Sequence, residues 1–106
     1  MNSNLKVVFH VSDLSQISRM MSNVNNILKE DNTITINVVI NGDAVTGFTK
    51  DKDLSLNPKA TYFLCNNSLN ANNIKKDNIL DLTNVTPSGV YKLLNLQLEG
   101  FKYIKS

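Results

Sequence analysis

The chain has little of the residue chemistry on which most small enzymes and metal sites depend. Its 106 residues include one cysteine, one histidine and no tryptophan. A single cysteine cannot form a disulfide within the chain, and with a single histidine it provides too few ligands for a zinc cluster. The sequence therefore predicts a free thiol, no metal site and no cofactor. A lone unpaired thiol is typical of a reducing compartment, so we expect a cytoplasmic protein.

Long runs of basic residues and long runs of apolar residues are also missing. The 11 basic and 9 acidic residues are spread along the chain, and Lys75-Lys76 is the only adjacent basic pair. This distribution does not favour binding to nucleic acid or to a membrane surface. No stretch approaches the roughly 18 apolar residues of a membrane span, and the chain does not open on a charged segment followed by an apolar one. The predicted partners therefore exclude nucleic acid and membrane.

Glycine is scarce and its spacing is uninformative. The four glycines are Gly42, Gly47, Gly89 and Gly100. They form no GxGxxG or GxxxxGK[ST] sequence, so the nucleotide-binding fingerprints are absent. A GxSxG nucleophile elbow is absent as well.

What is present is the pattern of one α/β domain spanning residues 1–106. Apolar and β-branched runs predict strands over residues 6–11, 33–40, 60–65, within 80–85, and 101–104. Apolar residues at steps of three and four predict helices over 14–28 and 90–98. The 14–28 helix should turn Met20, Met21, Val24 and Ile27 toward the sheet. This alternation predicts a mainly parallel sheet of about five strands. In residues 43–59 the pattern is weakest: Ala44, Val45 and Phe48 could form a short helix, and the remainder reads as an exposed loop.

Three special residues fall at predicted carboxyl ends of strands, namely His10, Asn41 and Cys65. In open α/β sheets ligands bind at this edge. Cys65 is either a reactive thiol or an ordinary buried one, and a helix beginning at Asn66 or Ser68 would favour its thiolate. His10 is either a base beside that thiolate or a satisfied core histidine.

The order of the strands decides between the two interpretations of His10. A 2-1-3-4-5 order would place His10 next to Cys65. If the second strand lies between the first and third, two spacings of ~4.8 Å separate the two strands and contact is doubtful.

The turn that follows the fourth strand has two interpretations. In Pro87-Ser88-Gly89, Ser88 is a helix cap, or the backbone N–H groups of the turn bind an anion. With these residues the predicted ligand-binding edge comprises Asn41, Gly42, Asn66, Ser88 and Gly89.

Several segments, in order along the chain, resemble the DsrE/DsrF-like sulfur-relay family. They are Lys6-Val7-Val8-Phe9-His10-Val11, Asn23-Val24-Asn25-Asn26-Ile27-Leu28, Val38-Val39-Ile40-Asn41-Gly42, Phe63-Leu64-Cys65-Asn66-Asn67-Ser68-Leu69, Pro87-Ser88-Gly89-Val90 and the ending Leu96 to Ile104. The resemblance implies a three-layer α/β/α sandwich, a homo-oligomer built as a trimer or hexamer, and a persulfide carried on the cysteine that corresponds to Cys65.

One departure from the family pattern bears on how the sheet is covered. The segment between Gly42 and Cys65 is shorter than usual, and the helix expected before the third strand is reduced to Leu54-Ser55-Leu56. We expect this face to leave apolar surface that, with the apolar C-terminal segment, a partner subunit covers.

Two functional hypotheses follow. In the first, Cys65 accepts sulfur from a donor protein and passes it to an acceptor protein, as a carrier rather than a turnover enzyme. In the second, the domain is a non-catalytic small-ligand-binding or oligomeric interaction module and Cys65 is an ordinary thiol. Whether the protein is an enzyme stays open at this point.

Overall fold

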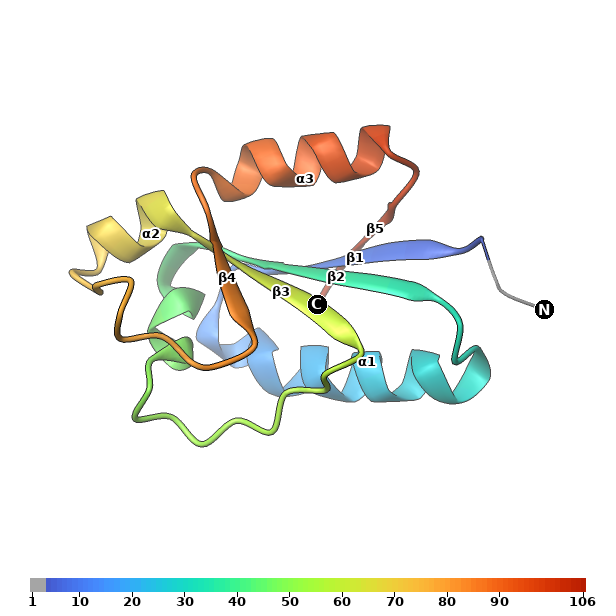
Figure 1. Cartoon of the computed structure of the whole chain (residues 1–106), viewed down its shortest axis with the longest axis horizontal. Helices are drawn as coiled ribbons and strands as arrows, with labels where there is room; N and C mark the ends of the chain where they lie inside the picture. The colour runs from blue at the N-terminus through green and yellow to red at the C-terminus, as the bar shows by residue number, and fades with distance from the viewer. Residues whose placement is uncertain (1–3) are drawn as a thin grey trace.

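A computed structural model describes residues 4–106, so residues 1–3 of the predicted domain lie outside it. The centre of the fold is a five-stranded sheet (Figure 1). Its strands are β1 (Lys6–Val11), β2 (Thr35–Ile40), β3 (Ala60–Cys65), β4 (Thr83–Thr86) and β5 (Lys102–Lys105). Their spatial order is β4-β3-β2-β1-β5, and each neighbouring pair is parallel. The predicted α/β class with a parallel sheet is confirmed.

The strand order settles the position of the second strand. β2 pairs with β1 on one side, matching Ile40 to Val11, and with β3 on the other, matching Ile40 to Leu64. The 2-1-3-4-5 alternative is therefore wrong. His10 on β1 and Cys65 on β3 are separated by a whole strand.

One face of the sheet is covered by the first helical segments. A one-turn 3-10 helix, η1 (Leu14–Gln16), leads into α1 (Ile17–Glu30). Asp13 and Gln16 form a reciprocal capping box that starts η1, which satisfies backbone N–H groups that would otherwise lack partners. Met20 and Val24 of α1 are fully buried against the sheet, as the sequence pattern predicts.

The opposite face is covered by α3 (Gly89–Leu98), which crosses from β4 at one edge to β5 at the other (Figure 1). It buries Leu93 and Leu96 against Val8, Val39 and Phe101. The helix starts at Ser88, whose side chain accepts a hydrogen bond from the Tyr91 N–H, so the predicted cap is present. With α1 below and α3 above the sheet, the fold has the three layers that the family resemblance implied.

Residues 42–59 cover the α1 side more completely than the sequence suggested. A 3-10 segment, η2 (Gly42–Phe48), fully buries Ala44, Val45 and Phe48 in the core. The expectation of exposed apolar surface between Gly42 and Cys65 is therefore wrong. Three apolar side chains of this tight 3-10 segment pack into the core on the α1 side. Leu54 and Leu56 also pack on this core without forming a helix.

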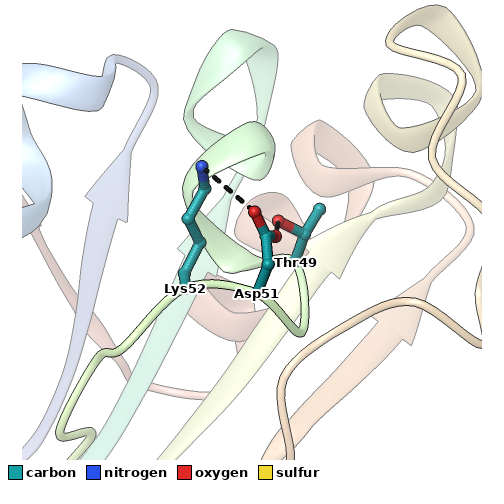
Figure 2. Close-up of polar contacts among 3 residues, drawn as sticks. All are labelled: Thr49, Asp51 and Lys52. Carbon is teal, nitrogen blue, oxygen red and sulfur yellow. Dashed lines mark hydrogen bonds and ion pairs between the residues drawn. The ribbon is translucent and has the colours of Figure 1, made fainter.

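The turn after η2 is held by local polar contacts. In Figure 2 the Thr49 hydroxyl donates to the Asp51 carboxylate, and the Lys52 ammonium lies 3.8 Å from the other carboxylate oxygen. The same turn is tied to the segment before β4, because Thr49 bridges Ile79 and the Leu80 N–H donates to the Phe48 carbonyl at 2.8 Å. The loop is therefore ordered despite its lack of regular structure.

Within residues 4–106, none of the helices combines the length and the apolar character that crossing a membrane requires.

Candidate functional site

The site begins with Cys65, which is both the last residue of β3 and the N-cap of the short helix α2 (Asn66–Ala71). The strand fixes the position of the Cys65 backbone at the carboxyl edge of the sheet, as predicted. Only 6% of the residue is exposed, so small molecules reach it more readily than large ones.

Polar groups near the Cys65 thiol oppose the effect of its burial on the pKa. Burial is the largest single influence on the Cys65 pKa and raises it, because it disfavours the thiolate. Hydrogen bonds from the Ser68 hydroxyl and from the backbone N–H groups of Gly89, Ser68 and Asn67 act in the opposite direction. Together the four outweigh burial, and the pKa of the thiol lies below its ordinary value.

Ser68 is held in place by Gly42. The Gly42 N–H donates to the Ser68 oxygen at 2.8 Å, which leaves the hydroxyl proton of Ser68 for the sulfur. Gly42 has a φ of +60°, and a Cβ at this position would lie 2.9 Å from the Ser12 carbonyl oxygen. The predicted ligand residue Gly42 therefore has a definite conformational role. Sequence reasoning gave Ser68 no role as a donor, although a serine three residues after an N-cap is the signal that could have shown it.

Gly89 lies over Cys65 and Asn41. A Cβ on Gly89 would stand 3.1 Å from the Cβ of Cys65 and 3.3 Å from the Cβ of Asn41, closer than nearly all real Cβ contacts. The missing side chain lets the start of α3 approach the strand ends, so its N–H group can reach the sulfur. Ser88 uses its hydroxyl as the cap of α3, and an anion at this turn stays a prediction.

His10 does not contact Cys65 as a base, because both of its ring nitrogens have other partners. Nε2 lies 2.9 Å from the Asn41 Oδ1, and Nδ1 lies 2.6 Å from the Tyr103 hydroxyl. The Asn41 oxygen can only accept, so Nε2 carries the proton and Nδ1 accepts from Tyr103. Burial lowers the pKa of His10, the Asn41 bond opposes this, and the Lys105 charge adds to the lowering, so the net shift is downward and the ring is neutral at pH 7.

The remaining predicted residue, Asn66, begins α2 directly after the thiol. Its Oδ1 atom is buried and, within residues 4–106, has no hydrogen-bond partner. The structure thus brings Cys65, Asn41, Gly42 and Gly89 together at one edge, with Asn66 following Cys65 in the chain and His10 joined to the group through Asn41. Over the same residues, no cluster of three His, Cys, Asp or Glu side chains could hold a metal ion.

A parallel five-stranded sheet between helical layers, with one strand ending on a free thiol, defines a small three-layer α/β protein. Residues 5–106 match the model of the DsrE/DsrF-like family, and the chain belongs to that family. Among solved structures it is similar to a protein of unknown function, MTH1491, from Methanobacterium thermoautotrophicum. The two share 27% sequence identity with a TM-score of 0.86, over 97% of this chain and 100% of that one. A search of curated proteins found no match.

Proposed function

We propose that the protein is a sulfur carrier that holds a persulfide on Cys65. The observation that supports this most directly is the position of a free thiol at the carboxyl edge of the sheet, where Cys65 is the N-cap of α2 and its pKa is lowered. Only the thiolate is a good sulfur nucleophile, so this arrangement favours the form that reacts. Membership of the family adds to the argument without naming a donor or an acceptor.

The transfer proceeds in two balanced steps. The Cys65 thiolate attacks the outer sulfur of a donor persulfide, a new S–S bond forms at Cys65, and the donor leaves as its own thiolate. An acceptor thiolate then attacks the outer sulfur on Cys65, takes it, and releases the Cys65 thiolate. Neither step consumes an oxidant or a reductant, so the protein needs only a donor protein and an acceptor protein. A lone thiol of this kind would stay free in a reducing compartment such as the cytoplasm.

Intact-protein mass spectrometry tests the proposal. After incubation with polysulfide, the wild-type protein should gain the mass of one sulfur atom and lose it on addition of excess thiol. The Cys65→Ser variant should fold normally and never gain that mass, because the hydroxyl is much less nucleophilic. If the wild-type protein stays unmodified under conditions that load a small free thiol, the carrier function is wrong.

We also propose that the protein acts as a homo-oligomer, built on a trimer or a hexamer. Its support is an apolar stripe on the outer side of α3, where four side chains are between 52% and 76% exposed: Val90, Tyr91, Leu94 and Leu98. Three of them recur at steps of four residues and form one ridge along the helix. A ridge without charge is costly to leave in water and can pack against the same ridge of another copy.

A further inference from the structure

A row of side chains crosses the carboxyl edge of the sheet on the α3 side. Tyr103 comes from β5, His10 from β1, Asn41 from the end of β2, and Cys65 from the end of β3. These four strands are consecutive in the sheet, in the order β5-β1-β2-β3. Hydrogen bonds of 2.6 Å and 2.9 Å join the first three members. Asn41 therefore occupies the interval that separates His10 from Cys65.

Asn41 lies beside Cys65 by register. Ile40 on β2 is matched to Leu64 on β3, so the next residues along the two strands are Asn41 and Cys65. Both residues lie close to Gly89. A Cβ added to Gly89 would lie 3.3 Å from the Asn41 Cβ and 3.1 Å from the Cys65 Cβ. The Asn41 oxygen is directed toward β1 by its bond to His10. The amide nitrogen is on the other branch of the planar group, and within residues 4–106 it makes no hydrogen bond that would hold it elsewhere.

We propose that Tyr103 and His10 are positioning residues that fix the Asn41 amide so that its N–H donates to the sulfur carried by Cys65. This inference rests on the proposed sulfur-carrier function and adds the residues that would hold the transferred atom. The outer sulfur of a persulfide lies ~2.05 Å beyond the cysteine sulfur. The donors of α2 and Gly89 hold the inner sulfur, so the outer one needs a donor of its own. No proton moves along the row, and its contribution is orientation.

The fixed orientation matters because the two ends of an amide have nearly the same shape and opposite hydrogen-bonding character. With its oxygen toward the outer sulfur, Asn41 would repel that sulfur in its anionic form, whereas with its nitrogen there it stabilises the anion. The neutral His10 ring, which donates from Nε2 only while Tyr103 donates to Nδ1, selects the second orientation. The other charged groups near the row are Lys105 of β5, whose ammonium donates to the Ser12 hydroxyl at 2.8 Å, and Lys92 of α3, which lies 4.3 Å from the centre of the Phe63 ring.

The test loads each variant with sulfur from polysulfide and then measures, in the same set of variants, the extent of loading and the pH dependence with which the Cys65 persulfide is alkylated. Asn41→Asp replaces the donor with a carboxylate that repels the anionic outer sulfur, and it should lower the extent of sulfur loading about tenfold and raise the alkylation midpoint of the persulfide. His10→Leu should act in the same direction, because Asn41 is then free to turn. His10→Gln should restore the wild-type profile, since the glutamine N–H can still donate to the Asn41 oxygen. Tyr103→Phe should shift the midpoint by a smaller amount.

Two matched controls separate this effect from general loss of stability. Asn26→Asp makes the same change on the exposed side of α1, and Tyr62→Phe removes a hydroxyl that donates to the Asn57 carbonyl away from Cys65. Both should keep the wild-type alkylation midpoint, even where the melting temperature falls. The inference is overturned if Asn41→Asp and His10→Leu are folded and alkylate as the wild type does, or if His10→Gln behaves as His10→Leu.

The inference and the proposed function fail in distinguishable ways. If wild-type Cys65 takes up no sulfur, the carrier function is wrong and the inference falls with it. If the wild type loads sulfur, and all variants load it equally with unchanged alkylation midpoints, the inference about the row is overturned. The carrier function then stands.

Discussion

Cys65 combines two properties that usually exclude one another, since it is almost fully buried and its pKa is lowered rather than raised. Burial in an apolar environment raises the pKa of a thiol. Here the burial is by donors: the Ser68 hydroxyl and three backbone N–H groups replace the water that a thiolate would otherwise need. Reactivity at such a site is set by the number of donors that remain and by the size of the attacking reagent.

Removing the Ser68 hydroxyl should therefore change Cys65 more than it changes the fold. In Ser68→Ala the sulfur loses its one side-chain donor, and the midpoint of alkylation with pH should rise, with a rate at neutral pH that is about tenfold lower. Iodoacetamide alkylation at a series of pH values measures this. Ser22→Ala, an exposed serine of α1, is the matched control and should leave the rate unchanged. Equal midpoints for Ser68→Ala and the wild type would show that the hydroxyl does not act on the thiolate.

His10 should make the stability of the protein depend on pH. The unfolded chain binds a proton at the ordinary histidine pKa of 6.5, whereas in the folded protein this pKa is lower. The resulting contribution to stability is complete above pH 6.5 and is lost as the pH falls through the folded value. Urea unfolding between about pH 7 and pH 5.5, above the range where most carboxylates titrate, should show a falling free energy of unfolding. In His10→Gln this fall should be smaller, and an identical slope would contradict the assignment.

At the scale of elements, the strands and helices follow directly from the apolar pattern, which is why most of them are found where the sequence predicts them. Periodicity reports which face of an element is buried and carries no information on which strands become neighbours. The position of β2 between β1 and β3, and with it the separation of His10 from Cys65, depends on long-range packing and could not be predicted. The same holds for the link from Gly42 to Ser68, which are 26 residues apart in sequence.

The largest boundary differences occur where local chemistry overrides the pattern. The predicted 14–28 helix is divided into η1 and α1 because Asp13 and Gln16 cap a single 3-10 turn first. The fourth strand, predicted as a short strand within residues 80–85, begins only at Thr83, after Leu82 adopts a positive φ of 73°. Hydrophobic periodicity does not depend on a cap that acts across one turn or on a strained backbone angle. These two boundaries could therefore not be predicted from it.

The α1 layer should be intolerant of charge on its inner side. Val24 is fully buried between α1 and the sheet, and Val24→Asp would place a carboxylate there without a partner. We expect a loss of about 4 kcal/mol or more in the free energy of unfolding. Chemical denaturation measures the loss. Asn25→Asp, the exposed neighbour on the same helix, should change the free energy of unfolding little, and an unchanged melting temperature for Val24→Asp would mean that the inner side of α1 has been misassigned.

At the scale of the whole molecule, the two faces of the sheet are covered by different numbers of helical segments. On the α1 side, α1 and η2 bury a large continuous core. On the α3 side a single helix covers the sheet, and its outer surface carries the apolar stripe of Val90, Tyr91, Leu94 and Leu98. Tyr103 and Ile104 on the edge strand β5 are also exposed. Ile104 lies beside Phe9 and Ile27 on the α1 side, so apolar side chains are exposed on both sides of the sheet, and the stripe on α3 is the surface on which the proposed assembly rests.

If the chain assembles through this stripe, the measured mass should depend on concentration, and one charged residue in the stripe should prevent assembly. Light scattering at micromolar concentration should give a mass that is a multiple of 11.8 kDa, with a trimer or hexamer as the expected state. Leu94→Glu places a carboxylate at the centre of the stripe, where burial against a partner is costly, and should reduce the mass to that of the monomer without lowering secondary structure. Leu82→Glu alters an equally exposed leucine that lies off α3, so its mass should remain that of the wild type. A wild-type protein that stays monomeric at these concentrations would contradict the assembly, and a Leu94→Glu variant that still assembles would place the interface on another surface, with the exposed side chains of β5 as the next surface to test.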